Sequence, residues 1–270
     1  MSDNSHQIQH VLGDELASDK GTGMTTQRTF SQEDKEYEAL YAGRASFDGA
    51  APGEVLIPWD IGEPQRAVVE LARAGGFSGK VLDAGCGLGE NAILLAGQGY
   101  EVTGVDGSPS AIEQAARRAG AHGVQVRFLT SDATELDGLG NDFDTVLDSG
   151  LYHCLNDEQR SAYAAALHRV CRPGATLHLF CFAQSVPSGT PIVEEALISE
   201  ANLHANLGRY WEIQDISEAV FATSFTRELL ARLGTAGAPD TGARPGPDAI
   251  QVDERGRVLT PMSYVRAQRR

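Results

Sequence analysis

Short apolar runs alternate with segments of helical periodicity along the chain from residue 64 to residue 182. Strands are predicted, in chain order, at residues 80–84, 100–106, 124–130, 143–148 and 175–182. Most of the intervals between them contain an amphipathic helix, as parallel neighbours in a sheet require. The alternation therefore predicts an α/β fold with helices on both faces of a doubly wound, mostly parallel sheet.

The chain on either side of this region follows other patterns. Residues 1–25 are polar without a sustained period, which predicts a flexible tail, and residues 31–43 predict a short amphipathic helix. Late in the chain, a helix capped by Ser199 precedes predicted strands near residues 211–222 and 262–268. No well-patterned helix connects these two strands, so we expect an antiparallel pair at the sheet edge.

Composition excludes several classes of function. The chain has 22 Lys and Arg against 37 Asp and Glu, a formal charge of −15, which repels nucleic acids and acidic membranes. No apolar run approaches the roughly 20 residues of a membrane helix, and no signal peptide pattern precedes the first helix, so we expect a cytoplasmic protein. The four cysteines lie far apart without metal-ligand spacing, which predicts reduced thiols and no metal site.

A glycine-rich turn, VLDAGCGLGEN at residues 81–91, joins a predicted strand to a predicted helix. Its three glycines let the backbone turn tightly and leave room for a ligand beside the helix N-terminus. The spacing is GxGxG, whereas dinucleotide-binding proteins have GxGxxG. Asp83 stands two residues before the first glycine, where its carboxylate suits an ammonium or sulfonium charge better than a pyrophosphate. Cys86, between two glycines, is expected to pack rather than react.

Further acidic residues follow the next strands. Asp106 ends the second strand, where a carboxylate can accept hydrogen bonds from both hydroxyls of a ribose. Asp132 follows the third strand, and Asp148 with Ser149 ends the fourth. In a parallel sheet these strand ends share one edge, so the acids and the glycine turn are predicted to line a single crevice.

These motifs together resemble the class I S-adenosylmethionine-dependent methyltransferases, which also have a turn such as Arg172-Pro173-Gly174 before their fifth strand. The resemblance implies a Rossmann-like, seven-stranded sheet with an antiparallel edge strand. It implies S-adenosylmethionine as cofactor and S-adenosylhomocysteine as product, with Asp132 and the Ala133 backbone holding the adenine. The residues expected to contact the cofactor are Trp59, Asp83, Gly85, Cys86, Gly87, Gly89, Asp106, Gly107, Ser108, Asp132, Ala133, Asp148 and Ser149.

Two further runs, IPWDIGEPQ at residues 57–65 and LDSGLYHCL at residues 147–155, resemble a small-molecule branch of this family. That branch contains thiopurine, halide/thiol and bacterial heterocyclic-toxin methyltransferases, and its N-terminal segment folds over the cofactor. The resemblance implies one methyltransferase domain over residues 26–270, whose parts are a lid at 26–66, a cofactor-binding core at 67–183 and edge strands with an insertion at 184–270. Trp59 then either covers the methionyl end of the cofactor or anchors the N-terminal loop in the core.

The methyl acceptor should approach just beyond the fourth strand, where Tyr152 and His153 lie. His153 is the first candidate for a base or an orienting group, although a histidine in such a turn is more often structural. Tyr37 and Tyr41, at helical spacing, are candidate acceptor contacts together with Trp59 and Tyr152, or ordinary core residues. The chain lacks the Asn/Asp-Pro-Pro-aromatic run of base methyltransferases, which disfavours a nucleic acid base as acceptor. A protein acceptor stays open, but the expected lid before the core favours a small phenolic or heterocyclic molecule methylated on O, N or S.

Other functions stay open at this point. A halide or thiol methyltransferase fits the same branch, and it would need no base. A nicotinamide-dependent oxidoreductase also has a glycine turn and an acid after the second strand, but Asp83 and the glycine spacing oppose it. A non-catalytic module would keep the fold without turnover. The sequence assigns no oligomeric state and no role to residues 227–258.

Overall fold

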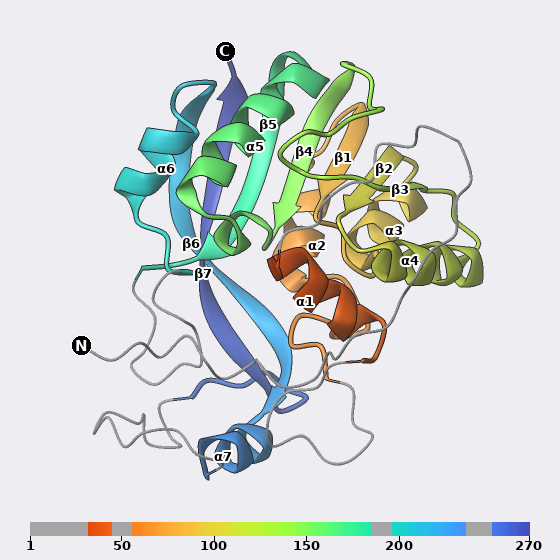
Figure 1. Ribbon diagram of the computed structural model, residues 1–270, viewed down its shortest axis with the longest axis vertical. Helices are drawn as coiled ribbons and strands as arrows, with labels where there is room; N and C mark the ends of the chain where they lie inside the picture. Colours follow the sequence, from red (N-terminus) through yellow and green to blue (C-terminus); the bar gives the residue numbers. More distant parts are fainter. Residues whose placement is uncertain (1–31, 45–55, 185–195, 236–249) are drawn as a thin grey trace, which may run out of the picture. The chain divides into compact units, whose positions relative to one another are not determined.

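The computed structural model describes residues 32–44, 56–184, 196–235 and 250–270 (Figure 1). The expected tail at residues 1–25 lies outside these ranges, so its flexibility stays a prediction. The described elements, in chain order, are α1 (Gln32–Tyr41), α2 (Arg66–Arg73), β1 (Lys80–Ala84), α3 (Glu90–Gly97), β2 (Glu101–Asp106), α4 (Pro109–His122), β3 (Arg127–Thr130), β4 (Phe143–Ser149), the 3-10 turn η1 (Tyr152–Cys154), α5 (Asp157–Val170), β5 (Cys171–Phe182), α6 (Glu200–Asn206), β6 (Trp211–Thr226), α7 (Arg227–Thr235) and β7 (Arg257–Arg269).

One seven-stranded sheet organises these elements, with the strand order β3-β2-β1-β4-β5-β7-β6. The five strands from β3 to β5 in this order are parallel, and β7 runs antiparallel to both β5 and β6. The Rossmann-like sheet and its antiparallel pair at one edge are therefore confirmed.

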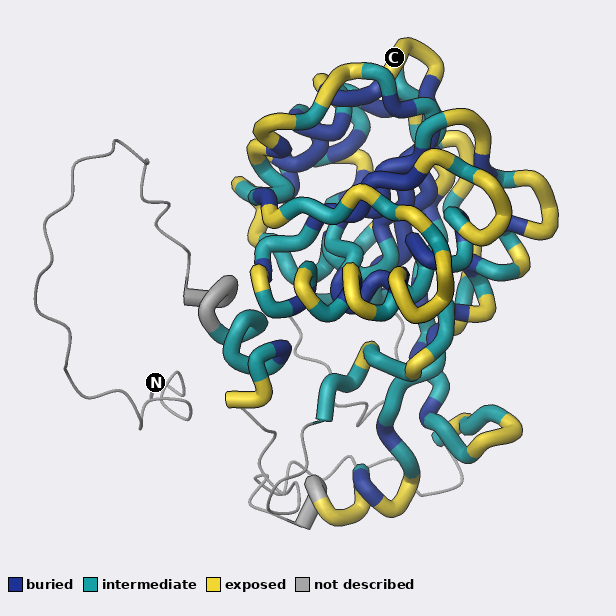
Figure 2. Tube along the Cα trace, turned by 90° about the vertical axis from the view of Figure 1, so that its right-hand side faces the viewer, coloured by how far each residue is buried: buried dark blue, intermediate teal, exposed yellow. Residues whose placement is uncertain are grey.

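Residues along the central strands alternate between two apolar cores. Val81 on β1 packs in one core with Val68 of α2, whereas its neighbour Leu82 packs in the other with Tyr163 and Leu167 of α5. Figure 2 shows the buried residues gathered along the sheet and beneath these helices. Burial on both faces explains why the central strands are uniformly apolar, as a doubly wound sheet requires.

Capping residues begin three helices where the sequence predicts. The Ser108 hydroxyl accepts a hydrogen bond from the Ala111 N–H at 3.0 Å and is followed by Pro109 at the first helical position of α4. Asn156 forms a capping box at the start of α5, and Ser199 caps α6. These caps satisfy N–H groups that have no partner within the helix, and so they fix where each strand-to-helix connection ends.

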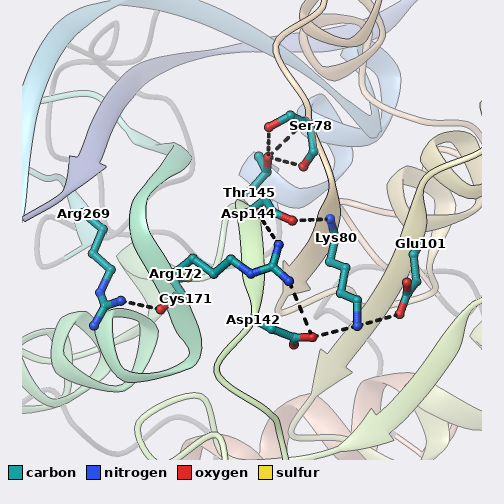
Figure 3. Close-up of polar contacts among 9 residues, drawn as sticks. All are labelled: Ser78, Lys80, Glu101, Asp142, Asp144, Thr145, Cys171, Arg172 and Arg269. Atoms are coloured by element: carbon teal, nitrogen blue, oxygen red, sulfur yellow. Dashed lines mark hydrogen bonds and ion pairs between the residues drawn. The ribbon is translucent and has the colours of Figure 1, made fainter.

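The amino edge of the sheet is held by charged side chains (Figure 3). Lys80 Nζ, at the start of β1, lies 2.7 Å from Asp142 Oδ2 and 3.2 Å from Glu101 Oε1. Arg172, in the predicted turn before the apolar part of β5, donates to Asp144 Oδ1 at 2.7 Å. This network engages the amino ends of the strands, and the acids predicted to bind a ligand lie at the opposite, carboxyl edge.

The edge strands are longer than predicted. β6 and β7 continue past the rest of the sheet and lead to α7, which packs on them through Phe225, Leu229 and Val258 (Figure 1). Ser224 of β6 contacts the segment before α2, donating from its N–H to Pro58 O at 2.8 Å and from its hydroxyl to Ile57 O at 2.9 Å. Leu229 and Leu230 of α7 thus close a small satellite core. None of the described helices is long and apolar enough to span a membrane.

Candidate active site

The carboxyl ends of β1, β2 and β4 bring together the acids that the sequence singled out. Ala84 on β1 pairs with Val105 on β2 and with Asp148 on β4, so Asp83, Asp106 and Asp148 come to the same edge of the sheet. The glycine turn follows β1 directly at this edge. Residues from three neighbouring strands therefore meet at the edge where the sequence predicts a crevice.

Asp83 is a buried carboxylate without a hydrogen-bonding partner. Its residue is 1% exposed, and neither oxygen has a hydrogen bond within the described part of the chain. Burial raises the pKa of Asp83 to about 7, and the nearby carboxylates of Asp148 and Asp106 add to the shift. The Ala92 N–H opposes the shift without meeting hydrogen-bond geometry. A buried acid in this state is costly unless a cation or donor completes it.

The glycine turn has a shape that side chains would disturb. Gly85 and Gly87 have φ of 71° and 52°, in the left-handed region. A Cβ on Gly85 would lie 2.7 Å from Leu151 Cβ, and one on Gly87 would lie 2.9 Å from the Tyr41 hydroxyl. The turn thus keeps its backbone close to both neighbours and fits a ligand that lies against main-chain atoms.

Asp106 is oriented by the turns on both sides of it. Its two oxygens accept hydrogen bonds from the Gly87 N–H and the Ser108 N–H, each at 2.9 Å. Cys86 packs within the glycine turn, and burial raises the pKa of its thiol well above the usual value, as expected of a residue that does not react. All four cysteines are free thiols, as predicted.

Asp148 and Asp132 both support their own turns. Asp148 Oδ1 accepts from the N–H groups of Gly150 and Leu151, at 3.1 and 2.8 Å, while Oδ2 accepts from the Tyr163 hydroxyl at 3.0 Å. Asp132 Oδ1 accepts from the backbone and the hydroxyl of Thr134. Their contact with a cofactor stays a prediction. The other residues of the predicted set, Gly89, Gly107, Ser108, Ala133 and Ser149, lie at or just beyond the carboxyl ends of β1 to β4.

An aromatic cluster from α1 and the segment before α2 lies beside the glycine turn. The Trp59 indole donates to the Tyr41 hydroxyl at 2.7 Å, and the Trp59 ring centroid lies 5.6 Å from Tyr37 and 6.1 Å from Tyr41. Trp59 is 40% exposed, whereas Tyr41 is buried against Leu88 and Ala111. Of the two tyrosines, Tyr41 packs as a core residue, and Tyr37 is only partly buried.

The segment that carries Trp59 is pinned by Arg118 of α4. Arg118 lies 2.8 Å from Asp60 Oδ2 and 2.5 Å from Glu90 Oε1, the first residue of α3, and all three side chains are largely covered. These two ion pairs join the segment before α2 to α3 and α4, the helices on either side of the glycine turn.

Substituting Arg118→Ala is expected to lower stability by about 1 to 2 kcal/mol, between the values for exposed and buried ion pairs, because it leaves two carboxylates close together. Thermal unfolding measures this loss. Arg117→Ala is the matched control, since Arg117 pairs only with Glu113 on the exposed face of α4 in the described structure. An equal loss in both variants would contradict the pinning role.

Tyr152, the first of the two candidate residues beyond β4, begins η1. Its side chain is fully buried, its hydroxyl donates to Asn202 Oδ1 of α6 at 3.2 Å, and the Arg160 guanidinium lies 5.5 Å from its ring centroid. These contacts turn the Tyr152 side chain toward α5 and α6, and its contribution to catalysis or acceptor binding stays a prediction. The same contacts hold η1 against α5 and α6.

His153, the next residue, is partly exposed and stacks on Phe182 at the end of β5, with ring centroids 3.8 Å apart. Its Nδ1 accepts a hydrogen bond from the Phe182 N–H at 3.3 Å, so the neutral ring carries its proton on Nε2. Burial lowers the pKa of His153 to about 3, and the nearby Arg160 adds to the shift. His153 is thus a neutral imidazole with an N–H at Nε2, and its role as a base or an orienting group stays a prediction.

Sequence reasoning missed several residues that build this site. Glu38, which contacts α4, lies beside Tyr37 on a helix for which only the two tyrosines were singled out. Asp60 and Arg118 are 58 positions apart, and no local pattern joins them. Phe182 ends a predicted strand at the carboxyl edge, and that position alone could have singled it out.

Comparisons with known proteins agree with this geometry. Residues 81–174 match the family model of a methyltransferase domain. Over 179 residues, the chain is 34% identical to the 2-heptyl-1-hydroxyquinolin-4(1H)-one methyltransferase of Mycobacteroides abscessus, which covers 65% of this chain and 78% of the relative. Over 144 residues it is 28% identical to thiocyanate methyltransferase 1 of Brassica oleracea, covering 50% of this chain and 61% of the relative.

One solved structure is also similar in sequence. It was described for the conversion of a disulfide bond into a thioacetal group during echinomycin biosynthesis. It has a TM-score of 0.68 and 33% identity to this chain, covering 87% of this chain and 92% of its own. The likeness thus extends over nearly the whole of both chains.

Proposed function

This chain belongs to the class I S-adenosylmethionine-dependent methyltransferases of small molecules, and we propose that its acceptor is a flat phenolic or heterocyclic compound methylated on O, N or S. S-adenosylmethionine is its cofactor. The nicotinamide-dependent oxidoreductase considered from the sequence is therefore wrong, and so is the non-catalytic module.

In the proposed cofactor site, Asp83 pairs with the methionyl ammonium group and Asp106 accepts from the ribose hydroxyls. The support for the first contact is the buried Asp83 carboxylate, which has no partner in the described structure. The glycine turn would lie along the methionyl chain, since a Cβ on Gly85 would fill the space beside Leu151. Asp132 and Ala133, after β3, are the candidates for the adenine.

When bound, the cofactor supplies an electrophilic methyl group on a sulfonium. The protein then has to hold an acceptor in line with that methyl group and exclude water, which can account for most of the acceleration. Trp59 and Tyr37 are proposed to cover the reacting groups, in a lid spanning residues 26–66 over a core of 67–183. The support is their aromatic contact beside the glycine turn.

His153 is proposed to orient the acceptor by donating from Nε2 to the attacking atom or its neighbour. Its stacking on Phe182 and the hydrogen bond at Nδ1 fix the ring, so the Nε2–H has a set direction. The acceptor would then lose its proton to solvent before it reacts, which favours compounds with an acidic hydroxyl or thiol.

A flat acceptor is favoured by the aromatic groups on two sides of the candidate site: Tyr37 with Trp59, and His153 with Phe182. The similarity to a hydroxyquinolinone methyltransferase supports the same class. The likeness to a thiocyanate methyltransferase keeps a halide or thiol acceptor as the second candidate. The net charge of −15 favours a small acceptor over a nucleic acid or an acidic membrane. We also propose that the protein is cytoplasmic.

An assay with isotope-labelled S-adenosylmethionine and a panel of acceptors tests this proposal. Hydroxyquinolones and acidic phenols are expected to react with kcat/KM at least about tenfold above azaheterocycles without a hydroxyl, small thiols and halides. This factor corresponds to about 1.4 kcal/mol of binding to the aromatic walls. Higher kcat/KM for iodide or thiocyanate than for every aromatic compound would favour the second candidate.

A further inference from the structure

A carboxylate on α1 makes three hydrogen bonds to the start of α4. Glu38 accepts from the Ser108 hydroxyl at 2.6 Å, the Ser110 N–H at 3.1 Å and the Ser110 hydroxyl at 2.7 Å. Burial acts to raise the pKa of Glu38, but these hydrogen bonds, together with the charge of Arg44 at 3.3 Å from Oε1, outweigh it and lower the value. The carboxylate is thus held ionised at the helix terminus whose dipole favours a negative charge.

Two further contacts extend α1 along the candidate crevice. The Tyr37 hydroxyl donates to Cys154 Sγ at 3.0 Å, which ties α1 to η1 beyond β4. The Gln114 side chain donates to Tyr41 O at 2.8 Å, which ties the end of α1 to α4. Between these points the Tyr41 hydroxyl lies close to Gly87, so the helix bridges the end of β2 and the end of β4 beside the glycine turn (Figure 1).

The two carboxylates at this place share one partner residue. The Ser108 N–H donates to Asp106, the residue proposed for the ribose, and the Ser108 hydroxyl donates to Glu38. Any displacement of Ser108 therefore changes both the orientation of Asp106 and the contact that holds α1. The cofactor site and the helix that bears Tyr37 are coupled through a single N-cap residue.

We propose that Glu38 is a positioning residue that latches α1 over the cofactor crevice. With the latch closed, Tyr41 covers the glycine turn, so the cofactor binds and leaves only when the hydrogen bonds of Glu38 break. The same latch sets Tyr37 and Trp59, which makes the acceptor wall depend on it. The latch depends on the cofactor contact proposed for Asp106, but not on the identity of the acceptor.

Glu38→Ala is expected to raise the dissociation rate of S-adenosylhomocysteine at least about tenfold, in the range for lost hydrogen bonds to a charged group. Stopped-flow fluorescence of the full-length protein measures that rate. Amide hydrogen exchange of the ligand-free protein should become at least about tenfold faster at residues 37–41, with the sheet unchanged. Ser110→Ala, which removes one bond and leaves Asp106 and Ser108 intact, should shift both rates the same way by a smaller factor.

Glu36→Ala is the matched control, because it removes the same charge from the same helix and Glu36 has no hydrogen bond or ion pair to α4 in the described structure. It should leave both rates within about twofold of the wild type. Unchanged ligand rates in Glu38→Ala, with faster exchange alone, would reduce Glu38 to a structural role and overturn the proposal. Equal effects of Glu36→Ala and Glu38→Ala would overturn it as well.

Discussion

Replacing Asp83 with alanine is expected to weaken the binding of S-adenosylmethionine by about 100-fold to several thousand-fold. The reason is that Asp83 is buried and unpartnered in the described structure, so the ligand ammonium is the charge that completes it. Removing one member of a buried ion pair costs about 3 to 5 kcal/mol, and each 1.4 kcal/mol is a factor of ten in affinity. Isothermal titration calorimetry with S-adenosylhomocysteine gives the same comparison without turnover.

Stability separates this effect from misfolding. Asp83→Asn keeps the size of the side chain and removes a desolvated charge, so the ligand-free variant is expected to melt at or above the wild-type temperature at pH 8. Asp106→Ala should weaken binding less, by about 10-fold to 150-fold, the range for hydrogen bonds to a charged group. A stable Asp83→Asn protein that binds within threefold of the wild type would contradict the ammonium contact.

The pH dependence follows from the same carboxyl group. The pKa of Asp83 is about 7 in the folded chain, above its ordinary value of 3.8, so the folded state holds this proton more strongly. Stability from this group is therefore highest at low pH and falls as pH rises from about 4 to about 7. Ligand binding needs the ionised form, so affinity should rise by up to tenfold per pH unit until about pH 7. Asp83→Asn should remove this slope.

The features that the sequence does predict depend on local patterns of burial. Val81 and Leu82 are apolar neighbours because each strand face has its own core, and that burial on both faces marks β1 as a central strand. The glycine turn and Asp83 are equally local, since all the residues that define them lie within one strand-to-helix connection. Ser108 and Asn156 could be recognised as caps because a cap bonds within its own helix.

Features that join distant parts of the chain could not be predicted in this way. β6 continues to Thr226 because Ser224 bonds to Ile57, 167 positions away, and to Pro58. Tyr152 and His153 are neighbours in a 3-10 turn, where no simple period decides which side chain is buried. Which of the two is buried depends on α6, where Asn202 Oδ1 accepts a hydrogen bond from the Tyr152 hydroxyl. For this reason both residues had the same candidate role in the sequence analysis, whereas the structure buries only Tyr152 fully.

Substitutions of His153 test whether this residue orients the acceptor or removes its proton. His153→Phe keeps a ring that can stack on Phe182 but removes the Nε2–H, and it is expected to lower kcat/KM by about 10-fold to 150-fold. His153→Gln retains an amide N–H and should recover most of this loss. Affinity for S-adenosylhomocysteine, measured by calorimetry, should stay within about threefold in both variants.

A base at position 153 would give the opposite pattern. The pKa of about 3 leaves His153 unprotonated throughout the neutral range, so wild type and both variants should show one inflection in kcat/KM, at the pKa of the acceptor itself. An acceptor series of decreasing acidity should then lose rate in parallel in all three proteins. If His153→Gln is as impaired as His153→Phe, and the loss grows as the acceptor becomes less acidic, His153 removes the proton and the orienting role is wrong.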